Sequence, residues 1–392
     1  MSTFVVHLPV KIVFGQGEVA RVGDNVTTLG RRAYLLADPY WANVGLADKV
    51  RADLEVAGIA TAVFSAVDPN PRWADVDRVG QMLRQFGAEF VIGLGGGSAI
   101  DMAKAVAVAA THQGSVEGYV NWNAAPKKVT SAVLPVVAIS TTAGTGAEVT
   151  QAAVMSDPAT RRKTAIFSEY LFPRVAIVDP DLTASLSPVL TAATGLDALS
   201  HSIEGMMNTQ KRNPFVDALS LDAISTISQY LPRAYRNGQD MEARSRMSWA
   251  AVLGGISIAV SGTTVPHGLG QPLGAHANVH HGLSIAAFLP AIIERSWEAD
   301  PILFARIATA MGAGETGLSV GAQARSAAGA VRSLMSKVGL DAEIAKIAIN
   351  QATAKDMVAD ATSYLGRLNE RHIHPLSKSD LMDIIKDSIT VR

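Results

Sequence analysis

Histidine spacing is the feature of this sequence that points most directly to chemistry. The chain of 392 residues has only nine histidines, and four of them fall in one short span: His267, His276, His280 and His281. No Asp, Glu, Lys or Arg occurs in residues 247–293, so we expect these imidazoles to be buried. Burial disfavours the charged imidazolium, and neutral imidazole is the form that binds metals.

An earlier motif supplies the carboxylate that such a site needs. Asp197 and His201 are four residues apart, so they share one face of a helix. An aspartate with three histidines suits a divalent cation such as Fe²⁺ or Zn²⁺. Alternatively, Asp197 and His201 are simply a hydrogen-bonded helix pair. Glu204 is either an acceptor that orients one of the ligands or an ordinary salt-bridge partner.

The later histidines also leave alternatives open. His280 and His281 are adjacent, so one of them must point away from any common centre. His276 is either part of the site or a hydrogen-bonded residue elsewhere in the core or on the surface. The two clusters together favour a metal site in one helical region.

A glycine-rich turn indicates a second binding site. Residues 90–98 run from a predicted strand into a strong helical pattern, with consecutive glycines at positions 95, 96 and 97. Such a turn lets the backbone and the helix N-terminus approach an anion, here the pyrophosphate of a dinucleotide. We expect Ser98 to cap the helix and donate to a phosphate. The spacing is not the G-x-G-x-x-G fingerprint, and the alternative is a tight turn without a ligand.

Two further segments fit a dinucleotide. Residues 140–148 follow a predicted strand and combine hydroxyl side chains with glycines, which suits contacts to phosphate or sugar. Asp38 ends the predicted strand 33–37, where a carboxylate can accept the hydroxyls of an adenosine ribose and repel a 2′-phosphate. The alternatives are an ordinary turn cluster and an Asp-Pro turn start.

The elements that must position these residues change character near residue 180. Strand patterns at 33–37, 62–67, 90–94, 133–140 and 175–179 alternate with helical patterns such as 73–86 and 99–111, which predicts a mostly parallel sheet covered on both faces. Helical patterns then follow at 188–208, 214–235, 243–261, 282–297, 301–311, 319–338 and 380–389. We therefore predict an α/β dinucleotide-binding domain over 1–182 and an all-helical metal-binding and substrate domain over 183–392.

Composition excludes several classes of function. Lys and Arg total 34 against 35 Asp and Glu, a net charge of −1, so no basic field for nucleic acid is expected. The absence of cysteine excludes disulfides, thiolate metal sites and a cysteine nucleophile. The most apolar stretch, 249–260, is too short for a membrane span of about 20 residues. We expect no signal peptide, no membrane partner and a cytoplasmic location.

Several motifs, taken in order, resemble one family. Residues 95–104 (GGGSAIDMAK), 140–150 (STTAGTGAEVT), 195–205 (GLDALSHSIEG) and 266–275 (PHGLGQPLGA), with His281-Gly282, are similar to the iron-containing (group III) alcohol dehydrogenases over nearly the whole chain. The resemblance implies an N-terminal dinucleotide-binding α/β domain, a C-terminal helical domain and an active site between them. It also implies NAD(H) and Fe²⁺, or Zn²⁺, as cofactors.

The resemblance assigns roles residue by residue. The implied metal ligands are Asp197, His201, His267 and His281. The implied cofactor-binding residues are Asp38, Gly96, Gly97, Ser98, Asp101, Thr141, Thr142, Thr145 and Lys163. Many family members have a histidine four residues after the third ligand, where this chain has Gln271, which cannot titrate. The catalytic group is then His267, Gln271 and His276, and the proton passes through water, a ribose hydroxyl or a histidine such as His276.

The expected reaction is hydride transfer between NAD(H) and a small alcohol or aldehyde. Residues 369–375 match a family segment that borders the site, and Arg371, His372 and His374 there would select an acidic semialdehyde. The alternative is that this segment is a solvated polar loop. Alternatives on the same scaffold are a maleylacetate reductase-like enzyme, a dehydroquinate synthase-like enzyme and a non-catalytic NAD-binding protein. We expect a homodimer or higher homo-oligomer, with residues 4–10 as a pairing edge strand.

Overall fold

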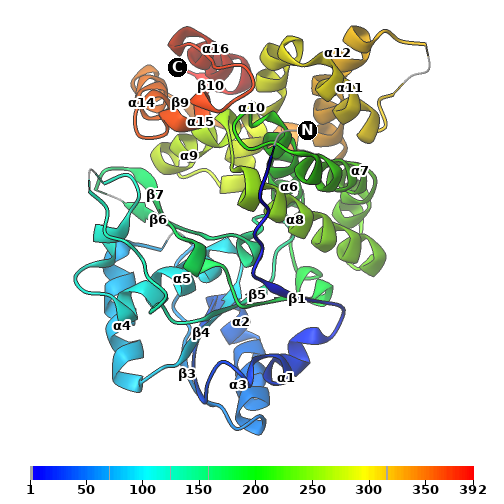
Figure 1. Ribbon diagram of the computed structural model, residues 1–392. Helices are drawn as coiled ribbons and strands as arrows, with labels where there is room; N and C mark the ends of the chain where they lie inside the picture. The colour runs from blue at the N-terminus through cyan, green and yellow to red at the C-terminus, as the bar shows by residue number, and fades with distance from the viewer. Residues whose placement is uncertain (1–2, 70, 124, 158, 315–316) are drawn as a thin grey trace. The chain divides into compact units, whose positions relative to one another are not determined.

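The computed structural model describes residues 3–69, 71–123, 125–157, 159–314 and 317–392. The chain divides into two compact units. Residues 8–142 and 146–183 form one, here called the sheet unit, and the N-terminal residues to 7, residues 143–145 and 184–392 form the other, the helical unit. Figure 1 labels most of the helices and strands of both units.

Within its described residues, the sheet unit is built on six parallel strands in the order β1-β8-β5-β4-β2-β3. The strands of this sheet are β1 (Lys11–Phe14), β2 (Arg32–Ala37), β3 (Ala60–Phe64), β4 (Phe90–Gly95), β5 (Val136–Ser140) and β8 (Val175–Val178). A separate antiparallel hairpin joins β6 (Ala152–Asp157) and β7 (Arg162–Phe167). The helices are α1 (Val22–Val26), α2 (Pro39–Asn43), α3 (Leu46–Val56), α4 (Trp73–Phe86) and α5 (Gly97–Thr111).

Alternating side chains of the strands bury both faces of this sheet. On β2, Leu35 packs into the cluster that contains α1 and α3, whereas Leu36 packs into the cluster that contains α4 and α5. A parallel sheet with helices on both faces needs such two-sided apolar strands. The predicted parallel α/β architecture is therefore confirmed.

The helical unit is organised around α6, which packs against α7, α8 and α10. The longer helices are α6 (Pro188–Met207), α7 (Pro214–Arg236), α8 (Met241–Ser261), α9 (Val265–Ala277), α10 (His281–Ser296), α11 (Pro301–Ala310) and α12 (Val320–Lys337). The C-terminal part adds α13 (Leu340–Ile344), α14 (Gln351–Thr362), α15 (Gly366–Glu370) and α16 (Lys378–Ser388), with a short parallel pair of strands, β9 (Ala348–Ile349) and β10 (Thr390–Val391).

The sequence of α6 determines both where the helix begins and how deeply it is buried. Ser187 accepts a hydrogen bond from the backbone N of Leu190 and caps the helix, and Pro188 occupies its first turn, where a proline is favourable. From Thr191 to Met207 the whole helix is buried. A helix buried on every side carries its polar residues into the core, where each needs a partner.

Several elements depart from the sequence prediction. Strand β1, the β6–β7 hairpin and α9 were not predicted, and β9 and β10 add two short strands to the region predicted as all helix. Helix α9 contains three glycines and two prolines, which lower its intrinsic helix propensity. It forms because α10 and α14 pack against it. Residues 4–10, predicted as an edge strand, have no regular secondary structure.

In the part of the chain that the structure describes, no single helix has both the length and the hydropathy needed to cross a membrane. Helices α8 and α9 meet that test only as a pair, bent by 106° where they join. Most of α8, which contains the apolar stretch 249–260, is buried in the helical unit.

Candidate active site

Four predicted ligands converge in the helical unit, around the carboxylate of Asp197. The distances from Asp197 Oδ1 to the Nε2 atoms are 3.6 Å for His201, 4.0 Å for His267 and 3.7 Å for His281. The Nε2 atoms of His201 and His267 lie 3.3 Å apart. Asp197 and His201 share one face of α6, as their spacing predicts, while α9 brings His267 and α10 begins with His281.

The donor set fits a divalent cation. Asp197 Oδ1 is buried and has no hydrogen-bond partner among the described residues. A buried carboxylate oxygen without a partner is costly, and a cation at this point would satisfy it. Asp197, His267 and His281 offer ligand atoms within 4.8 Å of one another, and His201 faces the same carboxylate. One carboxylate oxygen and three imidazole nitrogens suit Fe²⁺ and Zn²⁺.

Glu204 orients His267 through the ring nitrogen that faces away from Asp197. Its Oε1 lies 2.6 Å from His267 Nδ1 and accepts from Ser200 Oγ at 2.7 Å, and its Oε2 accepts from the backbone N of Thr264 at 2.6 Å. With Nδ1 donating to the carboxylate, the lone pair of His267 Nε2 faces the centre. Of the two roles predicted for Glu204, the structure shows the orienting acceptor.

Burial and charge set the protonation of this group. Burial lowers the pKa of His201, and nearby Asp197 only partly opposes it. At His267 burial also lowers the pKa, but the Glu204 carboxylate outweighs it and the net shift is upward. Burial raises the pKa of Glu204, yet His267 and the hydrogen bonds from Thr264 and Ser200 bring it below its usual range. Glu204 is therefore held as a carboxylate.

A glycine allows α10 to bring His281 to the centre. A Cβ on Gly282 would lie 2.2 Å from the backbone oxygen of Ala193 on α6, closer than real Cβ atoms come to any neighbour. The start of α10 therefore packs directly on the α6 backbone. His281 faces Asp197, whereas its neighbour His280 occupies the N-cap position of α10 and is exposed. The adjacent histidines thus point in different directions, and His280 is the one that points away from the centre.

Helix α9 carries the two remaining catalytic candidates, and they occupy different places. Gln271 is one turn beyond His267 and is half-buried. His276 is nine residues beyond His267, about half a turn away at roughly 100° per residue. Its Nε2 lies 2.8 Å from Asp360 Oδ2 of α14, and both side chains are about nine-tenths buried.

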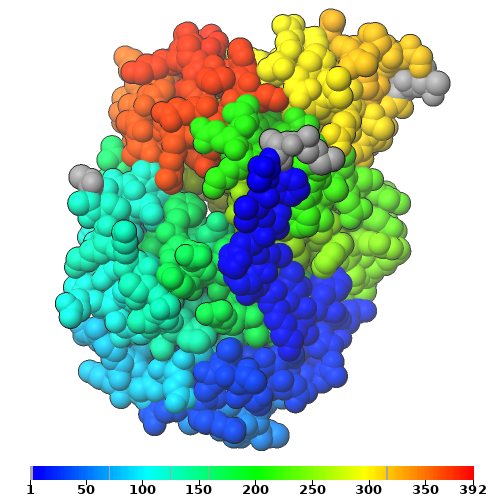
Figure 2. Space-filling view, in the orientation of Figure 1, coloured from blue at the N-terminus to red at the C-terminus, as the bar shows by residue number. Residues whose placement is uncertain are grey.

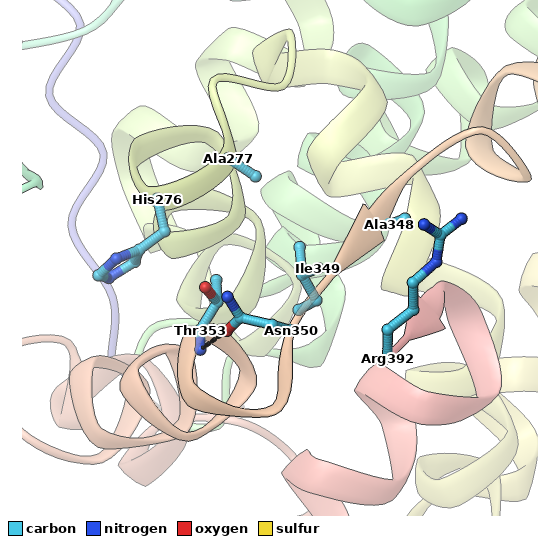
Figure 3. Close-up of a pocket in the computed structure, with 7 residues that line it drawn as sticks. All are labelled: His276, Ala277, Ala348, Ile349, Asn350, Thr353 and Arg392. Atoms are coloured by element: carbon cyan, nitrogen blue, oxygen red, sulfur yellow. Dashed lines mark hydrogen bonds between the residues drawn. The ribbon is translucent and has the colours of Figure 1, made fainter.

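His276 also borders a pocket at the C-terminal end of the chain (Figure 3). The pocket has a volume of about 390 Å³ and is lined by His276, Ala277, Ala348, Ile349, Asn350, Thr353 and Arg392. The structure thus gives His276 a carboxylate partner on α14 and a position on the side of α9 opposite to His267.

In the sheet unit, the predicted dinucleotide residues meet where the strand order reverses. The chain passes from β2 outward to β3, then returns to β4 on the other side of β2. Ligands of open α/β sheets bind at such a switch point, at the carboxyl ends of the strands. Asp38 follows β2, and Gly95 ends β4 with a φ of +153° and a Cβ position 3.1 Å from the Asp38 Cβ.

The glycine turn leads into α5 two residues earlier than the sequence suggested. The helix begins at Gly97 with Gly96 at the N-cap, so the prediction that Ser98 caps it is wrong. Ser98 Oγ instead donates to the backbone oxygen of Pro69. Asp38 caps α2 by accepting from Tyr40 N at 2.8 Å, so the Asp-Pro turn alternative also applies there.

The other predicted cofactor residues lie just after β5, on β7 or on α5. Thr141 and Thr142 come directly after β5, and Thr142 Oγ1 is buried without a partner among the described residues. The Thr142 side chain lies 3.3 Å from the Cβ position of Gly96. Lys163 on β7 acts electrostatically on Asp101 of α5, lowering its pKa against the dominant effect of burial. Thr145 belongs to the short segment grouped with the helical unit.

Comparison with known proteins agrees with this arrangement. Residues 9–180 match the iron-containing alcohol dehydrogenase model, and residues 191–389 match the C-terminal model of the Fe-containing alcohol dehydrogenase family. A choline dehydrogenase of Bacillus subtilis (strain 168) is 37% identical over 307 residues, 78% of this chain and 76% of the relative. An NAD-dependent methanol dehydrogenase of Bacillus methanolicus is 31% identical over 383 residues, 97% of this chain and 99% of the relative.

A solved 1,3-propanediol oxidoreductase has the same fold. It superposes with a TM-score of 0.91 at 30% identity, covering 99% of this chain and 100% of that one. The chain belongs to the iron-containing alcohol dehydrogenase family. The resemblance read from the sequence motifs is therefore confirmed, and so is the architecture it implied.

One buried group of this family member was missed by sequence reasoning. Lys104 of α5 is completely buried and donates to the backbone oxygens of Ala147 and Ala152 at 2.7 and 2.8 Å. It therefore anchors the segment after β5 to the helix that follows the glycine turn. The sequence signal was available, because Lys104 is a lone charge on an otherwise apolar helix face one turn after Asp101.

The Glu204 interaction generates a prediction about metal affinity. Replacing Glu204 with glutamine removes the charge that orients His267, so we expect the affinity for Fe²⁺ or Zn²⁺ to fall about 10–100-fold. Competition with a chromogenic chelator measures it. Glu294→Gln, which breaks a half-exposed pair with Arg332, is the matched control and should bind like the wild type. Unchanged affinity in the Glu204 variant would contradict the orienting role.

Proposed function

We propose that this protein is a metal-dependent oxidoreductase that transfers hydride between NAD(H) and a small alcohol or its aldehyde. The observation that carries the proposal is the convergence of Asp197, His201, His267 and His281, with Asp197 Oδ1 buried and unpartnered. The relatives are named for alcohols as different as choline and methanol, so family membership leaves the substrate open.

The four ligands would hold Fe²⁺, or Zn²⁺, with the lone pairs of neutral imidazoles and one carboxylate oxygen. Such an ion supplies Lewis-acid polarisation of the substrate oxygen. The protein's own part is to fix the ligand geometry. Glu204 fixes the His267 tautomer, and the close packing of α10 on α6 fixes His281. Preorganised ligands and a site closed to bulk water strengthen that electrostatic effect.

The NAD(H) side of the proposal rests on the sheet unit. Its glycine turn and the first turn of α5 present backbone N–H groups to a pyrophosphate, and Asp38 stands beside them for a ribose. Thr142 Oγ1, buried and unpartnered, is a further group that a bound cofactor would satisfy. The relative named as an NAD-dependent methanol dehydrogenase supports this cofactor.

The side chains of α9 limit the routes by which a proton can reach or leave the substrate. Gln271 can orient a substrate or a water by hydrogen bonds, but it cannot take a proton. His276 is held by Asp360 on the other side of the helix from His267. Among the routes predicted from the sequence, this placement supports water or a ribose hydroxyl rather than His276.

The other enzymes considered on this scaffold have less support. A dehydroquinate synthase-like or maleylacetate reductase-like enzyme is not favoured by any specific contact in the site. A non-catalytic NAD-binding protein would have no use for a complete set of four converging ligands.

Turnover and metal content test the proposal together. The protein loaded with Fe²⁺ without oxygen should reduce NAD⁺ with at least some members of a panel of small primary alcohols. His267→Ala should lose the metal and lower kcat/KM by at least about a hundredfold. His280→Ala, which changes an exposed neighbouring histidine, is the control. Wild-type turnover by the His267 variant without bound metal would refute the proposal.

Coenzyme choice tests the role of Asp38. Its carboxylate repels a 2′-phosphate with about 1–4 kcal/mol at contact distance, so removing the charge should raise relative use of NADP by about tenfold or more. Asp38→Ser keeps an acceptor for the cap of α2 while removing the charge. The ratio of kcat/KM for the two coenzymes measures the effect. An unchanged ratio would show that Asp38 serves only the helix.

We also propose a homodimer or higher oligomer. The N-terminal segment is extended on the surface, dark blue in Figure 2, and exposes Phe4 and Val5 at 44% and 82%. An exposed extended segment that belongs to no sheet can pair with another chain. Light scattering should give a mass of at least two chains, and deletion of residues 1–10 should lower it. A monomeric full-length protein would contradict this.

A further inference from the structure

The guanidinium of Arg371 forms no ion pair among the described residues, although the Glu204 carboxylate acts on it electrostatically. Arg371 follows α15 and is half-buried, and its Nε is buried without a hydrogen bond among the described residues. Other buried arginines of this unit have partners: Arg244, for example, donates to Thr191 Oγ1 and to the Gly238 oxygen.

A second arginine lies near it. Burial and, to a smaller extent, the charge of Arg367 together lower the pKa of Arg371 to about 10, while the Glu204 carboxylate opposes both. The charge of Arg367 thus acts on the guanidinium of Arg371, which forms no ion pair among the described residues. Two such positive charges are unfavourable by themselves and become favourable when an anion binds between or beside the guanidinium groups.

Backbone contacts hold Arg371 near the metal ligands. Its carbonyl oxygen accepts from Thr209 N at 2.9 Å and from Thr209 Oγ1 at 3.1 Å, just after the end of α6. Its guanidinium packs against Gly262, where a Cβ would lie 2.9 Å from Nη1. Gly262 precedes α9, whose first turn carries His267.

The charge of Arg371 reaches the proposed centre. It lowers the pKa of His267, although Glu204 outweighs it. On α15, Leu368 lies 3.7 Å from the Cβ position of Gly268, the residue after His267. The segment that carries both arginines therefore lies along the helix turn that presents a metal ligand.

The neighbouring histidines do not share this role. The sequence suggested that Arg371, His372 and His374 act together on an acidic substrate. His372 is buried, its Nε2 lies 2.9 Å from Ser296 Oγ, and burial lowers its pKa to about 3, so it stays neutral. His374 is exposed. The positive charge of this segment near the site comes from its arginines.

We infer that Arg371, assisted by Arg367, is a binding subsite for an acidic group on the substrate. The substrate class is a short aldehyde or alcohol that carries a carboxylate, sulfonate or phosphonate a few bonds from the reacting carbon. The inference rests on the proposed function, since the reacting oxygen must lie at the Asp197–His267 centre. In the reduction, the aldehyde carbon gains hydride from NADH and its oxygen gains a proton, while the acidic group is unchanged.

A rival role for Arg371 is to balance the buried charge of Glu204. That role predicts equal losses for all substrates on substitution, because the orientation of His267 would change whatever the substrate is. A subsite for an acidic group predicts a loss confined to anionic substrates and seen mainly in KM. The two roles therefore differ in selectivity, not only in activity.

The experiment compares matched aldehydes with the Fe²⁺-loaded enzyme and NADH. Succinate semialdehyde and sulfoacetaldehyde are the anionic probes, and butanal and propanal are the neutral ones. The variants are Arg371→Gln, Arg371→Lys, which keeps the charge but loses the two-pronged geometry, and Arg332→Gln as a surface control. Thermal unfolding reports whether each variant is folded.

We expect the wild type to favour at least one anionic aldehyde over butanal by about tenfold or more in kcat/KM. Arg371→Gln should abolish that preference. Its turnover of butanal should stay within about threefold of the wild-type value. Arg371→Lys should retain part of the preference. No preference in the wild type, or equal losses for butanal and the anionic aldehydes in Arg371→Gln, would overturn the inference.

A binding measurement separates this inference from the proposed function. Calorimetric titration with ethanesulfonate and with propionate should show binding to the wild type that weakens about tenfold or more in Arg371→Gln. If no aldehyde is reduced but this difference is present, the proposed function fails and the anion subsite stands. If butanal is reduced but neither anion binds, the subsite fails and the proposed function stands.

Discussion

The candidate site depends on two carboxylates that are buried on one helix. Asp197 and Glu204 both lie on the part of α6 that no solvent reaches. A buried charge must be compensated, or the group is driven to its neutral form. Glu204 is compensated by His267, Thr264 and Ser200. Asp197 Oδ1 has no such partners in the described chain, which leaves a cation as its natural complement.

This constraint joins elements that are distant in the sequence. Glu204 ties α6 to the turn before α9 and to His267, while Gly282 lets α10 pack on the α6 backbone and present His281. The proposed ligands are thus held by packing and hydrogen bonds of the helical unit itself. Ligand geometry fixed in advance is what a metal site needs for affinity and for catalysis.

Few charged residues surround the proposed metal centre, so each of them has a stronger electrostatic effect on it. Residues 247–293, which supply two of the four ligands, contain no Asp, Glu, Lys or Arg. In such surroundings the interaction of a half-buried guanidinium with an anion is screened less than at an exposed surface. Arg371 comes from a different part of the chain than the proposed ligands, so a substitution at Arg371 leaves all four of those side chains in place.

Much of the site followed from local sequence. Four-residue spacing placed Asp197 and His201 on one helix face, and the glycine turn between a strand and a helix marked the dinucleotide end of β4. Helix α4 was predicted at the residues where it occurs, 73–86, because its apolar positions repeat with the helical period. Local spacing suffices in these cases because the interacting groups are neighbours along the chain.

Tertiary structure decided the rest. Helix α9 forms despite its glycines and prolines because other helices pack on it, and only that packing places His267 beside Asp197. Packing between helices also places His281 beside Asp197 and pairs His276 with Asp360. In the segment after α15, burial keeps His372 neutral and leaves Arg371 as the charged group. Sequence alone determined which residue types were available for chemistry. Their partners are set by contacts between segments far apart in the chain, which spacing along the sequence cannot specify.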